Sequence, residues 1–285
     1  MVRLPGFEPG SQVWEAFTVD YSRVKNQFFG WMRNEEYSDI FVKDVKGYLE
    51  RYVSAELLKN PLDVLRIFES VQRGKRHLAL ALRTLFNFYE VLGFEKAFLD
   101  RLRKALPNIE CGIDLRIPTE NDIVASLKHL TKAPVKYQAL FSLLLDSGLR
   151  LVEGVELINN FKEAENVNGF YRCVIAMFRG EKQAYYGHFS EYTLGLIKEV
   201  KEKPDRINGS HYFKKYGFVA PKYLRKFAFD KMIELEIPES IADFIEGRVP
   251  KRIGAKHYMA LARQSSKFYP RYMEYITQLR QKTLN

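Results

Sequence analysis

Apolar residues recur at intervals of three and four along most of this chain, and only one stretch departs clearly to a strand-like pattern. In the first third the recurring residues are Leu78, Leu82, Leu85, Phe86, Tyr89 and Leu92, and Gly93 ends the run. This spacing puts apolar side chains on one face of a helix. Residues 170–178 are instead rich in β-branched and aromatic side chains. We therefore expect a mainly α fold with one small antiparallel β-sheet.

The length of the chain favours two domains. It has 285 residues, and single hydrophobic cores seldom grow beyond roughly 250 residues. Residues 107–118 contain Pro-Asn, Cys-Gly and Ile-Pro without helical periodicity, which is typical of a linker. We expect a flexible N-terminal segment at 1–18, a helical domain at 19–106, a linker at 107–118 and a mostly helical domain at 119–285.

The expected elements follow from the same patterns. Asn60 is a good N-cap and Pro61 suits a first helical position, so a helix should begin there. Residues 170–178 and 183–186 should form a hairpin with Lys182 near its tip. The other expected helices are 19–32, 41–52, 78–92, 119–130, 136–145, 191–202, 221–236, 238–245, 254–263 and 270–284.

Charge and cysteine usage narrow the possible partners. Lys and Arg total 45 against 35 Asp and Glu, giving a net charge of +10 and favouring a polyanion such as nucleic acid, although a basic surface also serves solubility. Cys111 and Cys173 lack the spacing of a disulfide framework or a zinc site, so we expect no metal. No apolar run reaches the ~18 residues of a membrane span, and the N-terminus lacks the order of a signal peptide. We expect a soluble, cytoplasmic protein.

The second half of the chain carries a series of cations followed by a tyrosine. In chain order the residues are Arg150, Lys182, Lys222, Arg225, Arg248 and Tyr258. Cations can hold a phosphate and offset the charge of its transition state, and a tyrosine can attack phosphorus with its own oxygen. Each element alone is unremarkable, because exposed basic residues on helices mostly serve solubility. Glu153, three residues after Arg150, either fixes the guanidinium or pairs with it at the surface.

In this order and spacing the residues resemble the tyrosine recombinase family, and most of all the integrases of archaeal viruses and plasmids. The resemblance covers most of the chain, because that family joins a helical DNA-binding domain to a mostly helical catalytic domain with a small β-sheet. Arg150 resembles the first catalytic arginine and Lys182 the hairpin lysine implicated as general acid. Lys222 and Arg225 fill the His-x-x-Arg box, Arg248 stands at a frequent histidine position, and Tyr258 takes the place of the nucleophile.

Two positions depart from the commoner family pattern. Lys222 and Arg248 replace histidines, which titrate near neutrality, with groups that stay mostly or always charged. Lys222 can act as a base only if neighbouring cations lower its pKa, whereas Arg248 can supply only charge and hydrogen bonds.

Tyr258 is one of 17 tyrosines, most of them expected to be packing residues. Tyr269, Tyr272 and Tyr275 are the rival nucleophiles, but they fall around Pro270 and in the last predicted helix. That helix has an apolar stripe without an obvious partner, and the family uses such helices to reach a neighbouring protomer. We therefore assign the nucleophile to Tyr258.

The resemblance also implies a reaction and its partners. It implies a 3′-phosphotyrosyl intermediate on double-stranded DNA attachment sites, no cofactor, and a homotetramer on DNA. A basic corner formed by Arg73, Lys75 and Arg76 is a candidate contact with the DNA backbone; a solvated loop is the alternative. A non-catalytic DNA-binding relative and a type IB topoisomerase-like enzyme remain alternatives for the whole protein.

The N-terminal residues suggest a target. Gly6-Phe7-Glu8-Pro9 can be encoded by GGN-TTC-GAA-CCN, which matches the T-arm of a tRNA gene. Integrases of archaeal elements often carry their attachment site inside their own gene. We therefore hypothesise integration at a tRNA gene, with an ordinary disordered tail as the alternative.

Overall fold

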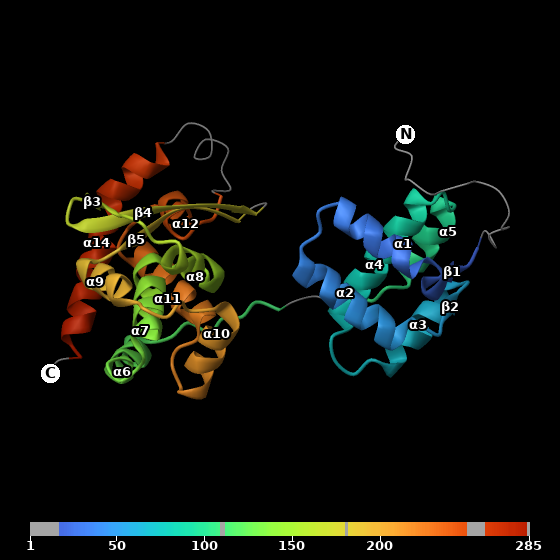
Figure 1. Cartoon of the computed structure of the whole chain (residues 1–285), viewed down its shortest axis with the longest axis horizontal. Helices are drawn as coiled ribbons and strands as arrows, with labels where there is room; N and C mark the ends of the chain where they lie inside the picture. The colour runs from blue at the N-terminus through green and yellow to red at the C-terminus, as the bar shows by residue number, and fades with distance from the viewer. Residues whose placement is uncertain (1–16, 109–111, 180–181, 250–259, 284–285) are drawn as a thin grey trace. The chain divides into compact units, whose positions relative to one another are not determined.

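The computed structural model describes residues 17–108, 112–179, 182–249 and 260–283, and it divides the chain into two compact units, Met1–Ile113 and Asp114–Asn285. The division falls within the stretch 107–118 that lacks helical periodicity. Both units are built mainly from helices, and each described β-sheet is small and antiparallel (Figure 1). The mainly α fold predicted from the sequence is thereby confirmed.

The N-terminal unit packs its helices around an aromatic core. The core includes Phe28, Trp31, Phe88 and Tyr89, and the Tyr89 hydroxyl donates to the carbonyl of Asp20 at 2.7 Å. The elements are β1 (Val19–Asp20), α1 (Tyr21–Asn34), α2 (Asp39–Tyr52), β2 (Leu57–Leu58), α3 (Pro61–Ser70), α4 (Lys75–Val91) and α5 (Lys96–Lys104).

The start of α3 shows why the local sequence predicted it. The side chain of Asn60 accepts from the backbone N–H of Leu62 at 2.9 Å, and Asp63 accepts from the backbone N–H of Asn60 at 3.1 Å. Pro61 occupies the first turn, where its missing N–H has no cost. The predicted cap and helix start are confirmed.

In the C-terminal unit, helices pack against a three-stranded β-sheet. Its elements are α6 (Glu120–Leu130), α7 (Val135–Ser147), α8 (Leu151–Asn159), β3 (Glu165–Val167), β4 (Phe170–Arg179), β5 (Lys182–Phe189), α9 (Glu191–Glu199), α10 (Arg206–Lys215), α11 (Pro221–Glu234), α12 (Glu239–Ile245) and α14 (Leu261–Gln281). The strand order is β3-β4-β5, and Arg179 pairs with Lys182 across the hairpin. The predicted hairpin is confirmed, whereas β3 and α10 were not predicted.

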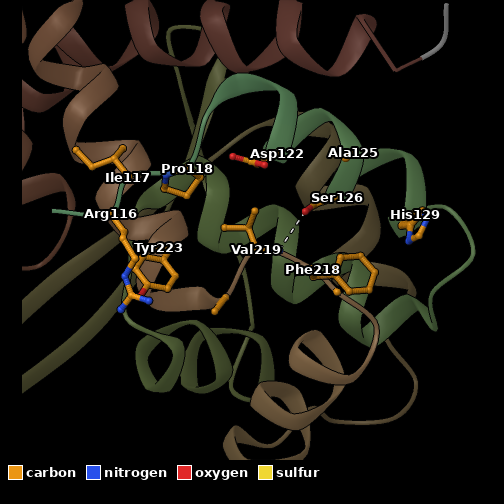
Figure 2. A pocket seen from close by; sticks show the side chains of 12 residues that line it. Arg116, Ile117, Pro118, Asp122, Ala125, Ser126, His129, Phe218, Val219 and Tyr223 are labelled. Atoms are coloured by element: carbon orange, nitrogen blue, oxygen red, sulfur yellow. Dashed lines mark hydrogen bonds between the residues drawn. The ribbon is translucent and has the colours of Figure 1, made fainter. Parts of the chain in front are cut away.

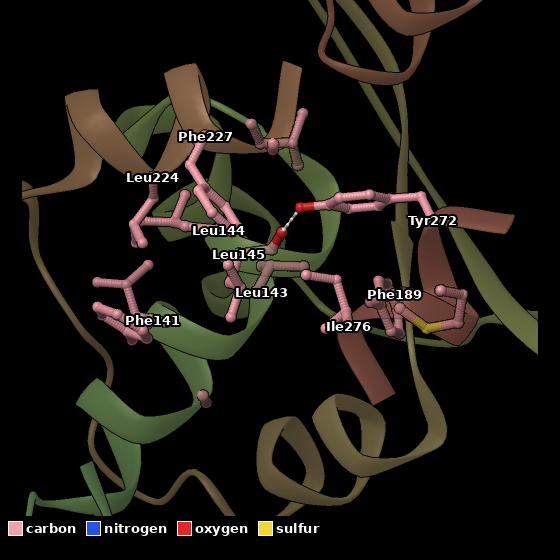
Figure 3. Close-up of a cluster of buried hydrophobic side chains, with 14 of the residues drawn as sticks. Phe141, Leu143, Leu144, Leu145, Phe189, Leu224, Phe227, Tyr272 and Ile276 are labelled. Carbon is pink, nitrogen blue, oxygen red and sulfur yellow. Dashed lines mark hydrogen bonds between the residues drawn. The ribbon is translucent and has the colours of Figure 1, made fainter. Parts of the chain in front are cut away.

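Helix α7 is the centre of this unit. Figure 3 shows Phe141, Leu144 and Leu145 of α7 among side chains from α11 and α14. Residues 139–147 of α7 are all buried, so the helix lacks a polar face, as expected for a segment enclosed by neighbours. Gly148 ends the helix with φ +62°, a left-handed conformation in which glycine carries no Cβ penalty.

The last helix differs from its prediction in two ways. It runs without a break from Leu261 through Pro270 to Gln281, although the proline was expected to begin a new helix. Its apolar stripe of Tyr272, Ile276 and Leu279 is buried in the core of its own unit. The expectation that this stripe is left for a neighbouring protomer is therefore wrong. Tertiary packing on both sides of Pro270 offsets the lost backbone hydrogen bond.

A buried polar network fixes α14 to the rest of the unit. Asp146 of α7 is fully buried and accepts from Arg280 Nη2 of α14 at 2.5 Å. The same carboxylate accepts from the hydroxyls of Ser190 and Thr193, each at 2.7 Å. The carboxylate of Asp146 thus links α7, α14 and the start of α9. No helix within the described residues is both long and apolar enough to cross a membrane.

Candidate active site

Arg150 is held at the start of α8 by a buried carboxylate. Its Nη1 donates to Glu153 Oε1 and to the carbonyl of Gly247, each at 2.9 Å. Glu153 also accepts from the backbone N–H of Arg150 at 2.9 Å and is itself fully buried. Of the two roles considered for Glu153, the structure shows the first, because the carboxylate fixes the guanidinium from the inside.

Arg225 is the innermost cation. It projects from α11, and its Nη1 donates to the carbonyls of Gly148 and Glu246 at 2.8 and 2.6 Å. Burial lowers the pKa of Arg225 to about 10; Glu246 opposes this shift, while the charges of Arg150 and Arg248 add to it. The group remains protonated at neutral pH, so it is a fixed positive charge at the base of the site.

Arg248 follows a turn that only glycine fits. Gly247 has φ +75°, and a Cβ there would lie 2.8 Å from the Cβ of Ala184 in β5. The guanidinium of Arg248 lies over the ring of Phe229 at 4.9 Å, and its Nη2 is 2.9 Å from Glu246 Oε2. The exposed fractions of the Arg225, Arg150 and Arg248 side chains are 11, 24 and 37%, so the three cations form a series from the interior to the surface.

Lys182 joins this cluster through its backbone. It begins β5, and it pairs with Arg248 as an isolated antiparallel bridge. Its side chain is exposed. The hairpin therefore places Lys182, the predicted general acid, beside Arg248 in the backbone, and its catalytic role stays a prediction.

Lys222 lies one turn before Arg225 but has a different partner. Its Nζ is 2.6 Å from Asp114 Oδ2, and its side chain is 63% exposed. The hydrogen bond to Asp114 raises the pKa of Lys222. The condition under which Lys222 could act as a base, a pKa lowered by neighbouring cations, is not met in the free protein, because the exposed ammonium is stabilised by a carboxylate.

The three rival tyrosines are occupied by structural contacts. Tyr269 and Tyr272 are fully buried and donate to the carbonyls of Asp146 and Leu145 at 2.9 and 2.7 Å. Tyr275 donates to Glu120 at 2.8 Å. Burial raises the pKa of all three phenols. Tyr258 lies outside the described residues, so its assignment stays a prediction.

Two acidic residues of the site were not found from the sequence. Glu246 is fully buried next to Arg225 and Arg248, and burial raises its pKa to about 7, against the opposing effect of the arginines. Asp114 accepts from Lys222, and the hydrogen bonds from Arg116 and Lys222 lower its pKa. The available signal for Glu246 was a carboxylate directly after Phe244-Ile245 and directly before Gly247-Arg248.

The basic corner of the N-terminal unit lies partly within a helix. Lys75 and Arg76 form the first turn of α4, after Gly74 at φ +82°, and Arg73 precedes it. All three side chains are exposed. The stretch was expected to be a corner between helices, so the structure corrects the position of Lys75 and Arg76. Helix N-termini carry partial positive charge, which adds to that of the side chains.

A cavity of about 500 Å³ lies elsewhere in the C-terminal unit. Figure 2 shows it between α6 and the segment before α11, with Phe218, His129 and Tyr223 in its wall. Val219 donates its backbone N–H to Ser126 at 3.1 Å beside it. None of the three arginines lines this cavity. Among the described residues, no group of three or more His, Cys, Asp or Glu side chains could hold a metal ion.

Comparison with known proteins supplies the family. A family model described as archaeal phage integrase matches residues 115–275. Among solved structures, the integrase from mycobacterium phage Brujita is 11% identical with a TM-score of 0.41, covering 88% of this chain and 92% of that chain. The XerA recombinase is 17% identical with a TM-score of 0.33, covering 91% and 98%. No curated protein sequence matches the chain. Because the family model spans more than half of the chain, the protein belongs to the archaeal phage integrase family.

Proposed function

We propose that this integrase is a site-specific DNA recombinase that cuts and rejoins strands through a 3′-phosphotyrosyl intermediate on Tyr258. The observation that carries the proposal is the convergence of Arg150, Arg225 and Arg248. Residues far apart in the sequence meet at the turn 246–248, and the carbonyls of that turn accept from two of the arginines. In an integrase, a cluster of arginines of this kind is expected to bind a DNA phosphate.

The cluster would act by fixed charge. Arg150 and Arg248, the more exposed pair, would donate to the non-bridging oxygens of the scissile phosphate. Arg225 would add positive charge from beneath. Preorganised donors of this kind stabilise the extra charge of the transition state, and they also favour the phenolate of an approaching tyrosine.

The covalent step would follow in a balanced exchange. The Tyr258 phenol loses its proton to solvent, its oxygen attacks phosphorus to form the tyrosyl–phosphorus bond, and the bond from phosphorus to the 5′ oxygen breaks. Lys182, exposed at the start of β5, would give its proton to that oxygen. The free 5′ hydroxyl of a partner strand then attacks the phosphotyrosine, and the tyrosine is released.

Lys222 would enter the site by exchanging partners. In the free protein its ammonium is bound to Asp114 at 2.6 Å. A DNA phosphate would replace that carboxylate, because both are anionic acceptors for the same exposed lysine. Asp114→Asn should therefore increase DNA affinity, most clearly at low salt. Glu234→Gln, which removes an exposed carboxylate paired with Lys231 on the same helix, is the control for the lost negative charge.

The N-terminal unit would bind the DNA backbone through Arg73, Lys75 and Arg76. Their exposed side chains and the N-terminus of α4 suit phosphate binding. The partner would be double-stranded attachment-site DNA, with four copies assembled on two sites. Residues 6–9 can be encoded by a T-arm-like DNA sequence, and on that ground the target would be a tRNA gene.

The test is incubation with a nicked duplex that carries a tRNA T-arm sequence, followed by denaturing electrophoresis. The nick makes the released fragment, which carries the free 5′ hydroxyl, short enough to diffuse away, so the covalent intermediate accumulates. We expect an adduct with the natural protein and with Tyr275→Phe, and none with Tyr258→Phe. Salt-sensitive binding without an adduct on T-arm or random-sequence duplexes would instead favour the non-catalytic relative. Relaxation of supercoiled DNA without joining of two sites would favour the topoisomerase-like alternative.

A further inference from the structure

Glu246 is an unusual residue for the centre of a phosphate-binding site. Its side chain is fully buried, and its Oε2 lies 2.9 Å from Arg248 Nη2 and 3.4 Å from Arg225 Nη2. Within the described residues, neither carboxylate oxygen nor Arg225 Nη2 has a partner in hydrogen-bond geometry. Buried polar atoms without such partners are costly and call for an explanation. Here the interaction with the arginines is one of charge alone.

The carboxylate packs closely against the end of α7. A Cβ on Gly148 would lie 2.7 Å from Glu246 Oε1, so the carboxylate lies directly against the glycine that ends α7. The backbone carbonyl of Glu246 accepts from Arg225, and that of the next residue, Gly247, accepts from Arg150. One short turn therefore organises all three arginines.

The charges around Glu246 are balanced before any phosphate arrives. Facing it are Arg150 at the start of α8, Arg225 from α11 and Arg248 after α12, together with Asp243 of α12; Glu153 of α8 pairs with Arg150, and Tyr272 of α14 also faces it. Three guanidinium groups thus stand with three carboxylates, Glu153, Asp243 and Glu246. Among the described residues, these six groups carry no net charge when all are ionised, so the excess positive charge then comes only from the exposed side chains of Lys182 and Lys222.

We propose that Glu246 is a positioning residue that sets the charge of the arginine cluster: ionised, it holds Arg225 and Arg248 in the free protein, and it takes up a proton from solvent when a phosphodiester binds. The inference rests on the proposed function for the identity of the anion. Proton uptake leaves the cluster with one net positive charge, and the neutral carboxyl still fills the space beneath Gly148. Burial already favours the neutral form, since it raises the pKa of this group to about 7. An anion close by raises the pKa further.

The experiment uses sulfate as the probe, because its charge is constant between pH 6 and pH 9. Sulfate affinity of the full chain is measured from the rise in thermal stability with sulfate concentration, at several pH values. A potassium chloride series at matched ionic strength corrects for salt. For the natural protein we expect the dissociation constant to weaken about tenfold or more from pH 6 to pH 8.5, since binding needs one proton.

Glu246→Gln keeps the shape and removes the titration, so its sulfate affinity should change less than about twofold over the same range. Asp243→Asn is the matched control, since it removes another buried carboxylate facing Arg248 and should keep the pH dependence. Unchanged pH dependence in Glu246→Gln, or its loss in Asp243→Asn alone, would overturn the proposal. Absence of sulfate binding to the natural protein at every pH would overturn it as well.

A second measurement needs no variant. Carbon-13 NMR of the side-chain carboxyls in the natural protein should show one buried glutamate whose titration midpoint rises when sulfate is added; an unmoved midpoint contradicts the proposal. These results are independent of the covalent assay. If the natural protein forms no phosphotyrosyl adduct but binds sulfate with the expected pH dependence, the proposed reaction is rejected and the role of Glu246 is retained.

Discussion

The buried pair of Asp146 and Arg280 gives a stability prediction that can be worked from the structure. Arg280 Nη2 lies 2.5 Å from Asp146 Oδ1, and the two side chains are 13% and 0% exposed. Arg280→Gln would leave a buried carboxylate without its cation. Breaking such a pair from one side costs about 3–5 kcal/mol. Oδ2 of Asp146 keeps its donors from Ser190 and Thr193, so we expect the lower end, about 3 kcal/mol.

The assay can separate the two units. Both tryptophans, Trp14 and Trp31, belong to the N-terminal part of the chain, so tryptophan fluorescence follows that unit. Far-ultraviolet circular dichroism follows the helices of both. For a unit of this size, about 3 kcal/mol corresponds to a fall of roughly 6–12 °C in its midpoint. We expect this shift in the dichroism transition and none in the fluorescence transition.

Two controls test the reasoning. Arg271→Gln removes an exposed arginine from the same helix and should change stability by less than about 1 kcal/mol. The double variant Asp146→Asn with Arg280→Gln removes the stranded charge and should recover more than half of the loss. The reasoning is refuted if Arg280→Gln is no less stable than Arg271→Gln, or if the double variant is less stable than Arg280→Gln.

Three further predictions follow from the site. Tyr272→Phe leaves the buried carbonyl of Leu145 without its donor and should cost about 1–3 kcal/mol in urea unfolding while adduct formation persists; loss of the adduct would make Tyr272 the nucleophile. Gly148→Ala combines φ +62° with a Cβ 2.7 Å from Glu246 Oε1 and should cost roughly 2–4 kcal/mol; a smaller effect would show that Glu246 can move. Glu246 has a pKa raised to about 7 in the folded chain, so its ionisation lowers stability as pH rises from about 4.5, the ordinary value, to 7. Between pH 5 and pH 8, the free energy of unfolding of Glu246→Gln should therefore rise relative to that of the natural protein, by at most about 3 kcal/mol. If urea unfolding shows the same difference in stability between the two proteins at every pH, this prediction is contradicted.

The periodic spacing of apolar residues predicted those helices that bury one face. The cap at Asn60 was readable because it involves residues only three positions apart. Helix α10 was missed because only Gly209 and Phe213 of its residues are buried, so no apolar stripe marks it. The continuation of α14 through Pro270 was missed for the opposite reason, since distant packing overrides a local helix-breaking signal.

The site divides in a similar way. Arg150, Arg225 and Arg248 could be selected in order along the chain, and the structure brings them together. The partner of Lys222 could not be predicted, because Asp114 lies more than a hundred residues away in the sequence. Glu246 gains its significance only from the burial and the arginines around it. Charge pairing between distant segments leaves no periodic signal in a sequence.

The most direct test of the central claim is to identify the residue that carries the DNA. The adduct formed on the nicked duplex is digested with nuclease and protease, and the modified peptide is sequenced by mass spectrometry. The account predicts a single nucleotide-bearing residue, Tyr258, in the segment between Arg248 and the start of α14. Modification of Tyr269, Tyr272, Tyr275 or a serine instead would contradict it.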